Sequence, residues 1–385
     1  MTLRYAVVLG FVAFVTSFGA HVVAVNLPVY AREVGVGLAM IGILIAAYDF
    51  AEVMAKPLFG ALADRAGMKK TMLAGIGVFI AASLMYLWIP PKLLLLVRFL
   101  QGLGAAGLSA VSLALVGTYY RERRGRAFGI YNAVKGAGYV LSPVVGGLVV
   151  LHANFAAIFM ACAVVGALAL VGALMLPDPG REAHLEDDDD EFSLAALTAV
   201  VRQPSLLRWY GIIVLNMFFV GILFGFVPVR VHELRYGTTG TTLLLTLTAL
   251  SYLAVQPIAG RLADAMDAAK TIRVGLALSG LAIVAVPFAT GWVLGAVCTL
   301  AGLGVGAVWT NTDALVSALA REGRLGTTMG IAGSFKELGD MLGPALIGAL
   351  SQALGLTAGF VICGILGVAC AAMLQRVPEN AAGAS

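Results

Sequence analysis

Residues 49–71 of the chain read DFAEVMAKPLFGALADRAGMKKT. The first half of this stretch places Asp49, Glu52 and Lys56 within an apolar run, and the second half is a glycine-rich turn that carries several charges. The flanking runs are as apolar as a membrane span, and a charged side chain in a membrane costs several kcal/mol unless it is paired or has a function. The stretch therefore predicts a spanning helix with paired or functional charges, followed by a charged loop.

The composition of the whole chain supports a membrane location. Of the 385 residues, 60% are hydrophobic and only 12% are charged, which is typical of an integral membrane protein. Apolar runs of about 20 residues recur along the chain, and each could cross about 30 Å of hydrocarbon as a helix. The first run is too long for a signal peptide. We predict spanning helices at about 5–30, 38–63, 70–89, 92–119, 126–151, 154–176, 206–229, 240–263, 271–290, 292–319, 326–351 and 355–375.

The basic residues of the connecting loops predict the orientation of these helices. One set of loops is rich in them: Arg65, Lys69, Lys70, Arg121, Arg123, Arg124, Arg126, Arg181, Arg202, Lys270, Arg273, Arg321, Arg324 and Arg376. The opposite loops hold only Arg32, Lys92, Arg230 and Arg235. By the positive-inside rule, both termini are cytoplasmic, as expected for a multi-pass protein of a bacterial-type inner (plasma) membrane.

A polar stretch and an internal repeat divide the chain into halves. We predict an N-terminal six-helix bundle over residues 1–176, a cytoplasmic linker over 177–205 and a C-terminal six-helix bundle over 206–385. The linker contains EDDDDE, which we interpret as a solvated acidic segment, with calcium binding as the weaker alternative.

The two halves resemble each other in sequence. KPLFGALADRAGMKKT (56–71) aligns with QPIAGRLADAMDAAKT (256–271), and GIYNAVKGAGYVLSP (129–143) aligns with GIAGSFKELGDMLGP (330–344). Such a repeat predicts two pseudo-symmetric bundles related by an axis along the membrane normal, with a substrate site at their interface. The predicted fold is an all-α integral membrane protein with twelve transmembrane helices.

Three motifs carry a family resemblance: GALADRAGMKK (60–70), RFLQG (98–102) and GYVLSPVVGG (138–147). They resemble the signatures of the major facilitator superfamily, and within it those of the twelve-helix drug:proton antiporters. The third motif departs from the antiporter pattern because a serine stands where a glycine is usual before proline. Its motif residues are Gly138, Ser142, Pro143, Gly146 and Gly147.

The resemblance implies that the loop over 60–70 is a conformational latch. Small residues permit close helix contact, and the Asp64 carboxylate can face the positive N-terminus of another helix. By position, its predicted partner is the start of the helix over 326–351, near Gly326. The alternative is a charged loop that only fixes the topology. The predicted latch residues are Gly60, Asp64, Arg65, Gly67, Lys69 and Lys70.

The buried charges form two predicted clusters. Asp49, Glu52 and Lys56 share one helix face, and the helix over 326–351 repeats this arrangement with two acids and one lysine. Each cluster has one negative charge in excess, and a surplus carboxylate in a low dielectric should bind a proton. The alternative is that the charges only pair across the interface between the halves. The proton-coupling candidates, with the arginine to which the resemblance assigns this role, are Asp49, Glu52, Arg98, Glu337 and Asp340.

Several other side chains are candidates for partner or substrate contacts. Lys135 and Arg98 have no acidic residue within one helical turn, so each needs another helix, a wet cavity or an anionic ligand. The charge partners or anion-binding candidates are Lys56, Lys135 and Lys336. The polar cavity candidates, for each of which an interhelical hydrogen bond is an equal alternative, are His21, Asn26, Gln101, Asn216, Asn311 and Asp313.

These features predict a secondary active transporter that moves a small organic solute by alternating access, through drug or metabolite:proton antiport. A proton symporter or uniporter for a small solute, either anionic or uncharged, is the alternative, and a non-transporting receptor or assembly factor is a remote one. The four cysteines lie in apolar runs, and we find no P-loop, metal cluster or catalytic triad. We therefore expect no enzyme activity, no cofactor beyond the proton gradient, no metal and no nucleic acid, and a functional monomer in the lipid bilayer.

Overall fold

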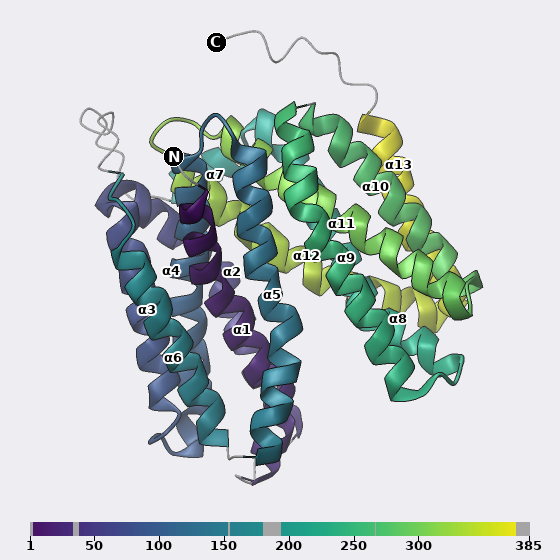
Figure 1. The fold of residues 1–385 in the computed structure, drawn as a ribbon, viewed down its shortest axis with the longest axis horizontal. Helices are drawn as coiled ribbons and strands as arrows, with labels where there is room; N and C mark the ends of the chain where they lie inside the picture. The colour runs from purple at the N-terminus through teal and green to yellow at the C-terminus, as the bar shows by residue number, and fades with distance from the viewer. Residues whose placement is uncertain (1–2, 34–37, 153–154, 180–193, 266, 375–385) are drawn as a thin grey trace. The chain divides into compact units, whose positions relative to one another are not determined.

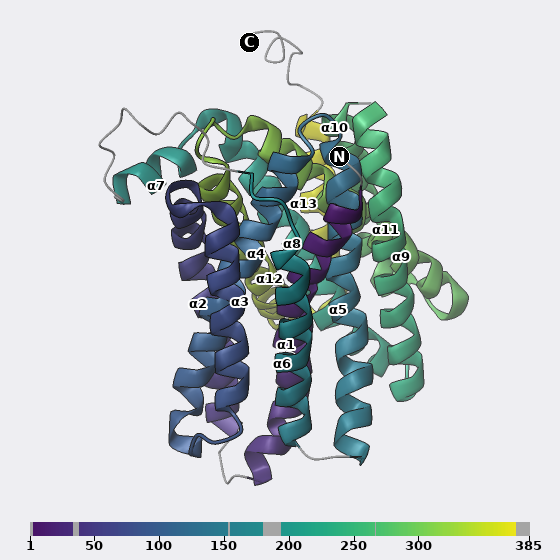
Figure 2. The ribbon, with the colours of Figure 1, turned by 60° about the vertical axis from the view of Figure 1, so that its left-hand side comes forward.

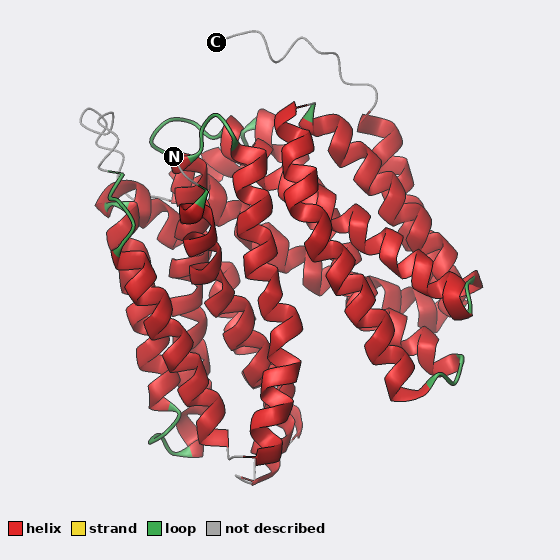
Figure 3. Ribbon diagram, viewed as in Figure 1, coloured by secondary structure: helices red, strands yellow, loops and turns green. Residues whose placement is uncertain are grey.

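The computed structural model describes residues 3–33, 38–152, 155–179, 194–265 and 267–374. Within these residues the regular elements are all helical (Figure 3). Figure 1 labels the α-helices, which are α1 (Arg4–Glu33), α2 (Leu38–Ala66), α3 (Met68–Met85), α4 (Leu94–Tyr119), α5 (Arg124–His152), α6 (Phe155–Leu174), α7 (Leu194–Val201), α8 (Pro204–Glu233), α9 (Gly237–Ala265), α10 (Ala268–Ala285), α11 (Gly291–Leu319), α12 (Leu325–Leu354) and α13 (Leu356–Met373).

The long helices follow the ranges predicted for spanning segments, and the additional short helix α7 lies in the predicted linker. Nine helices in the described part of the chain are long and apolar enough to cross a membrane. The other three long helices, α2, α5 and α12, are those that carry Lys56, Lys135 and Lys336. The all-α membrane fold is therefore confirmed.

The helices form two compact units. The first comprises Met1–Gly211 and Asp313–Glu337, and the second comprises Ile212–Thr312 and Leu338–Ser385. Helices α11 and α12 thus each contribute to both units, so the first half of α12 packs with the N-terminal helices. Within the first unit, α1 packs along α5, and α4 packs along α2 and α3 (Figure 2).

Close backbone contact explains the motif on α5. A Cβ atom added at Gly138 would lie 2.7 Å from the Ser17 Cβ and 2.8 Å from the Phe18 nitrogen of α1. The hydroxyl of Ser142, one turn later, lies within hydrogen-bond distance of the Phe18 carbonyl of α1 at 3.2 Å and of the Gly138 carbonyl of its own helix at 2.5 Å, and its one hydrogen is shared between these two acceptors. The motif therefore joins α5 to α1, and its serine contributes a hydrogen bond that a glycine could not make.

Candidate functional site

Asp64, near the end of α2, binds the first turn of α12. Its Oδ1 accepts a hydrogen bond from the Gly326 amide at 2.6 Å, and its Oδ2 accepts from the amide and the hydroxyl of Thr327, each at 2.7 Å. The first amides of a helix have no partner within the helix and lie at the positive end of its dipole. A carboxylate is therefore the matching acceptor. The segment near Gly326, which the sequence predicts as the partner of Asp64, is the one that Asp64 contacts.

Asp64 lies just beyond the span predicted over 38–63, and burial governs its charge. Burial raises the pKa of its carboxyl to about 6, whereas the hydrogen bonds from Thr327 and Gly326 act in the opposite direction. Above about pH 6 the group is ionised, so all three donors then bind a charged acceptor.

The same contact needs two glycines. A Cβ atom at Gly60 would overlap the Gly326 carbonyl, and a Cβ atom at Gly326 would overlap the Gly60 carbonyl. Gly67, with φ of 102°, then forms the turn into α3. Only glycine permits the two backbones to approach this closely, which places the Asp64 carboxylate against the end of α12.

The basic residues of the loop have different surroundings. The Lys69 ammonium donates to the carbonyls of Leu174 at 3.0 Å and Leu176 at 2.6 Å, so it satisfies acceptors at the end of α6. Lys70 is exposed, and Arg65 is partly exposed. The loop thus binds the end of one helix through Lys69 and the start of another through Asp64.

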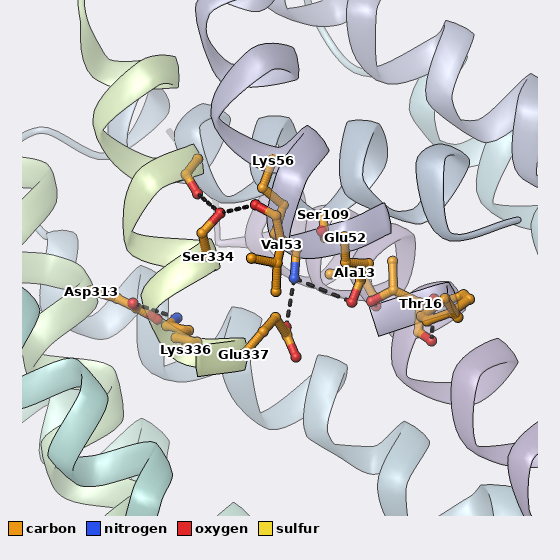
Figure 4. Close-up of polar contacts among 12 residues, drawn as sticks. Ala13, Thr16, Glu52, Val53, Lys56, Ser109, Asp313, Ser334, Lys336 and Glu337 are labelled. Carbon is orange, nitrogen blue, oxygen red and sulfur yellow. Dashed lines mark hydrogen bonds and ion pairs between the residues drawn. The ribbon is translucent and has the colours of Figure 1, made fainter. Parts of the chain in front are cut away.

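Lys56 is the centre of a buried charge cluster (Figure 4). Its Nζ lies 2.6 Å from Oε1 of Glu337 on α12 and 3.3 Å from Oε2 of Glu52 on its own helix. Lys56 is 3% exposed and Glu52 is 6% exposed. Oε1 of Glu52 has no hydrogen-bond partner in the described part of the chain. One ammonium therefore serves two carboxylates.

A second cluster joins three helices. Nζ of Lys336 on α12 lies 2.6 Å from Oδ1 of Asp313 on α11, and the Asn132 amide of α5 donates to Oδ2 of Asp313 at 2.9 Å. Figure 4 shows the side chains of Lys336 and Asp313 directed toward each other. The sequence pattern had grouped Lys336 with Asp340, four residues later, and placed Asp313 only among the polar cavity candidates. Asp313 belongs to the buried charges, as a partner of Lys336.

Arg98 is held by uncharged groups. Its guanidinium donates to the Gln101 side-chain carbonyl at 2.9 Å and to the Ala20 carbonyl at 3.2 Å, and lies over the Tyr48 ring at 4.4 Å from the centroid. A desolvated cation–π contact contributes about 2 kcal/mol. The Gln101 amide in turn donates to the Ser83 hydroxyl at 3.1 Å. Gln101 is therefore part of the Arg98 network.

Comparison with known proteins identifies the family. The sequence profile described as Major Facilitator Superfamily matches residues 9–245 and 212–384. The chain belongs to the Major Facilitator Superfamily. It is therefore a multi-pass membrane transporter.

Relatives and solved structures of this superfamily resemble the chain to different extents. It is 32% identical over 224 residues to the puromycin resistance protein pur8 of Streptomyces alboniger. The matched region covers 55% of this chain and 44% of that protein, so the chain spans less than half of its length. It is 24% identical over 381 residues to the bacillibactin exporter of Bacillus subtilis (strain 168), covering 90% of each. The crystal structure of the human organic anion transporter MFSD10 (TETRAN) shares its fold, with a TM-score of 0.79 at 19% identity, covering 97% of this chain and 100% of that chain.

The other polar candidates of this superfamily member contact the main chain. The Asn216 amide donates to the Val305 carbonyl at 3.2 Å, and the Asn311 amide donates to the Ala307 carbonyl at 2.7 Å. His21 Nδ1 lies 2.8 Å from the Ser17 carbonyl. These side chains therefore have structural hydrogen bonds. Three predicted residues lie outside the described side chains, namely Asn26, Pro143 and Gly147.

Two residues of the transporter's charged region were not predicted from the sequence. Asn132 binds Asp313, and the hydroxyl of Ser334 on α12 donates to the Val53 carbonyl of α2 at 2.6 Å. Asn132 lies three residues before Lys135, on the same face of α5, which is the one sequence signal that could have indicated it. Ser334 gave no such signal.

The glycine contact of the transporter leads to a prediction. We expect Gly60→Ala to increase hydrogen–deuterium exchange at the amides of Gly326 and Thr327 by about tenfold, because the added methyl group overlaps a backbone carbonyl and overpacking costs about 1–3 kcal/mol. Gly77→Ala on α3 is the matched control, since a Cβ atom there meets nothing within 4 Å. Equal exchange in both variants would show that α2 and α12 tolerate the extra methyl.

The Asp313 cluster leads to a prediction about stability. We expect Asp313→Asn to lower the free energy of unfolding in detergent by about 3–5 kcal/mol, because it removes a buried carboxylate from the Lys336 ammonium. Adding Lys336→Met should recover most of the loss. Glu233→Gln is the control, since its pair with Arg230 is partly exposed and contributes about 0–1 kcal/mol. A loss no larger than that of the control contradicts the prediction.

Proposed function

We propose that this transporter exports small, amphipathic organic compounds and takes up protons in exchange, by alternating access. It would do so in a bacterial inner membrane, with both termini in the cytoplasm. The observation that carries the proposal is the group of buried Glu52, buried Lys56 and partly exposed Glu337, in which one ammonium pairs with two carboxylates.

The charge of this group supports proton binding. Two carboxylates and one ammonium leave one negative charge in surplus, and a buried charge without a full partner is costly. A proton on either carboxylate removes the surplus, and Lys56 can then pair fully with the other. Glu52 is the better placed to accept it, since its Oε1 has no donor among the described residues.

Asp64 supports the alternating-access part of the proposal. Its three hydrogen bonds to the start of α12 form a contact that can be made in one conformation and broken in another. We assign this contact the role of a latch. The moving bodies would be the predicted halves, residues 1–176 and 206–385.

The names of the relatives support the direction of transport. One is a resistance protein for puromycin and the other is an exporter of bacillibactin. Both names refer to organic compounds, and the second states export.

A compound screen tests the proposal. The purified protein is reconstituted into proteoliposomes that contain a pH-sensitive dye, and a library of organic compounds is added under a proton gradient. We expect amphipathic members to cause proton movement that protein-free liposomes do not show. If no compound moves protons, the proposed exchange is rejected, and resistance or hypersensitivity on expression in cells then distinguishes export from uptake.

Lys135 favours a second function, symport or uniport of a small anion. Its side chain is partly exposed, and within the described residues it has no hydrogen bond or ion pair. With a proton on Glu52 or Glu337, the group of Glu52, Lys56 and Glu337 is neutral, and Lys135 is left as a cation beside it. Protons and anions would then bind together rather than displace each other. Accumulation of an anion inside vesicles with an inward proton gradient, rather than its exclusion, would support this function.

A further inference from the structure

Gln256 is a buried amide without a partner. It lies on α9, within the second unit, and is 0% exposed. Neither its Nε2 nor its Oε1 has a hydrogen-bond partner in the described ranges. A buried polar group left unsatisfied costs about 1–3 kcal/mol, so a bound ligand, an internal water or a function is expected at such a group.

The sequence repeat shows what Gln256 lacks. It aligns with Lys56, which binds Glu52 one turn earlier on its own helix. The residue that corresponds to Glu52 in the second half is Tyr252, whose ring packs against Trp309 at 5.5 Å between centroids. The second half of the chain therefore keeps a long polar side chain, Gln256, where the first half has Lys56. It has Tyr252 in place of Glu52, the carboxylate that binds Lys56 in the first half.

The register of α9 and α11 indicates which residue of α11 lies against the backbone turn of Gln256. A Cβ atom at Gly302 would meet the Thr248 carbonyl at 2.5 Å, and one at Gly306 would overlap the Tyr252 carbonyl. Residue 302 of α11 thus lies against residue 248 of α9, and residue 306 lies against residue 252, so the same register advances by four residues on both helices. The next step pairs residue 310 with residue 256.

Thr310 is the residue at that step. It is 0% exposed, and its hydroxyl also has no hydrogen-bond partner in the part of the chain that the structure describes. Neighbouring turns of α9 and α11 therefore carry two unsatisfied groups: an amide with donors and an acceptor, and a hydroxyl that can both donate and accept. Neither group carries a charge.

We propose that Gln256 and Thr310 form a neutral hydrogen-bonding subsite for the exported compound. The subsite binds an uncharged group that both donates and accepts, such as a hydroxyl or an amide, and selects compounds that carry one. Both residues are buried in this conformation. In alternating access, a site that is closed in one conformation is open to solvent in another. This assignment rests on the proposed export function. An internal water molecule could also donate to and accept from both groups, and the experiment below distinguishes it from a bound compound.

Two isosteric variants test the subsite. Gln256→Met keeps the length of the side chain and Thr310→Val keeps its shape, and each removes only the hydrogen-bonding groups. Unfolding in detergent is measured first. We expect both variants to be at least as stable as the wild type, because each removes an unsatisfied polar group.

Transport is then measured in proteoliposomes with the screened compound that gives the largest proton signal. We expect each variant to raise its half-saturating concentration about tenfold, with the maximal rate changed less than twofold. Thr312→Val is the matched control, since the Thr312 hydroxyl donates within its own helix to the carbonyls of Val308 and Trp309 at 2.9 Å. The control should keep the wild-type half-saturating concentration.

The possible results separate the explanations. Unchanged transport with unchanged stability overturns the subsite and leaves a site for internal water only. Reduced stability in Gln256→Met overturns it in favour of a structural amide. A screen in which no compound moves protons rejects the export function, and the subsite with it, before any variant is made.

Discussion

Asp64→Asn is expected to reduce transport to less than one tenth of the wild-type rate while the protein still inserts and purifies normally. The amide group of asparagine would place a donor against either the Gly326 amide or the two Thr327 donors. Each hydrogen bond to a charged group contributes about 1.5–3 kcal/mol. Because about 1.4 kcal/mol is a factor of ten in an equilibrium, the loss of one bond weakens the contact at least tenfold.

The repeat supplies the control for this variant. Asp264 occupies the position of Asp64 in the second half of the chain and is exposed. We expect Asp264→Asn to transport at close to the wild-type rate in the same proteoliposomes. Wild-type flux in Asp64→Asn, with the protein amount checked by size-exclusion chromatography, would show that the contact with α12 is not a latch.

Glu52→Gln and Glu337→Gln are each expected to abolish compound-driven proton movement. Each change leaves Lys56 with a single carboxylate, so the group becomes neutral and no surplus charge remains to bind a proton. The pH dependence of compound transport should disappear together with the proton signal. A pH-sensitive dye inside proteoliposomes measures the proton signal, and compound transport assayed between about pH 5.5 and 8.5 measures the pH dependence.

Glu233→Gln is the matched control here too, because its carboxylate pairs with Arg230 at 3.2 Å at a partly exposed site. Its proton signal should equal that of the wild type. If both buried variants retain full pH-dependent transport, Glu52 and Glu337 only hold α2 and α12 together, and the proton site lies elsewhere.

Much of the fold could be predicted because it depends on local properties. Length and apolarity locate the spanning helices, and the glycine-rich turn at Gly67 ends α2 near the predicted position. The spacing of Glu52 and Lys56 also indicates their contact, since residues four apart share a helix face.

The rest of the charged region depends on which helices pack together. Glu337 binds Lys56 although the two residues are 281 positions apart in the chain, and Lys336, the neighbour of Glu337, binds Asp313 on another helix. Sequence spacing cannot show such neighbours. The unsatisfied amide of Gln256 is likewise invisible in the sequence, where a glutamine in an apolar run only suggests some interhelical partner.

The two copies of the repeated loop make different contacts. Asp64 binds the start of another helix, whereas in the second copy Asp264 is exposed and Asp267 caps its own helix by accepting from the Ala269 amide at 2.9 Å. The first copy contacts the ends of two other helices, through Lys69 and Asp64. The second copy, at exposed Asp264, is therefore the place to insert an epitope or a fusion partner for labelling, because an insertion there leaves these contacts of the first copy unchanged.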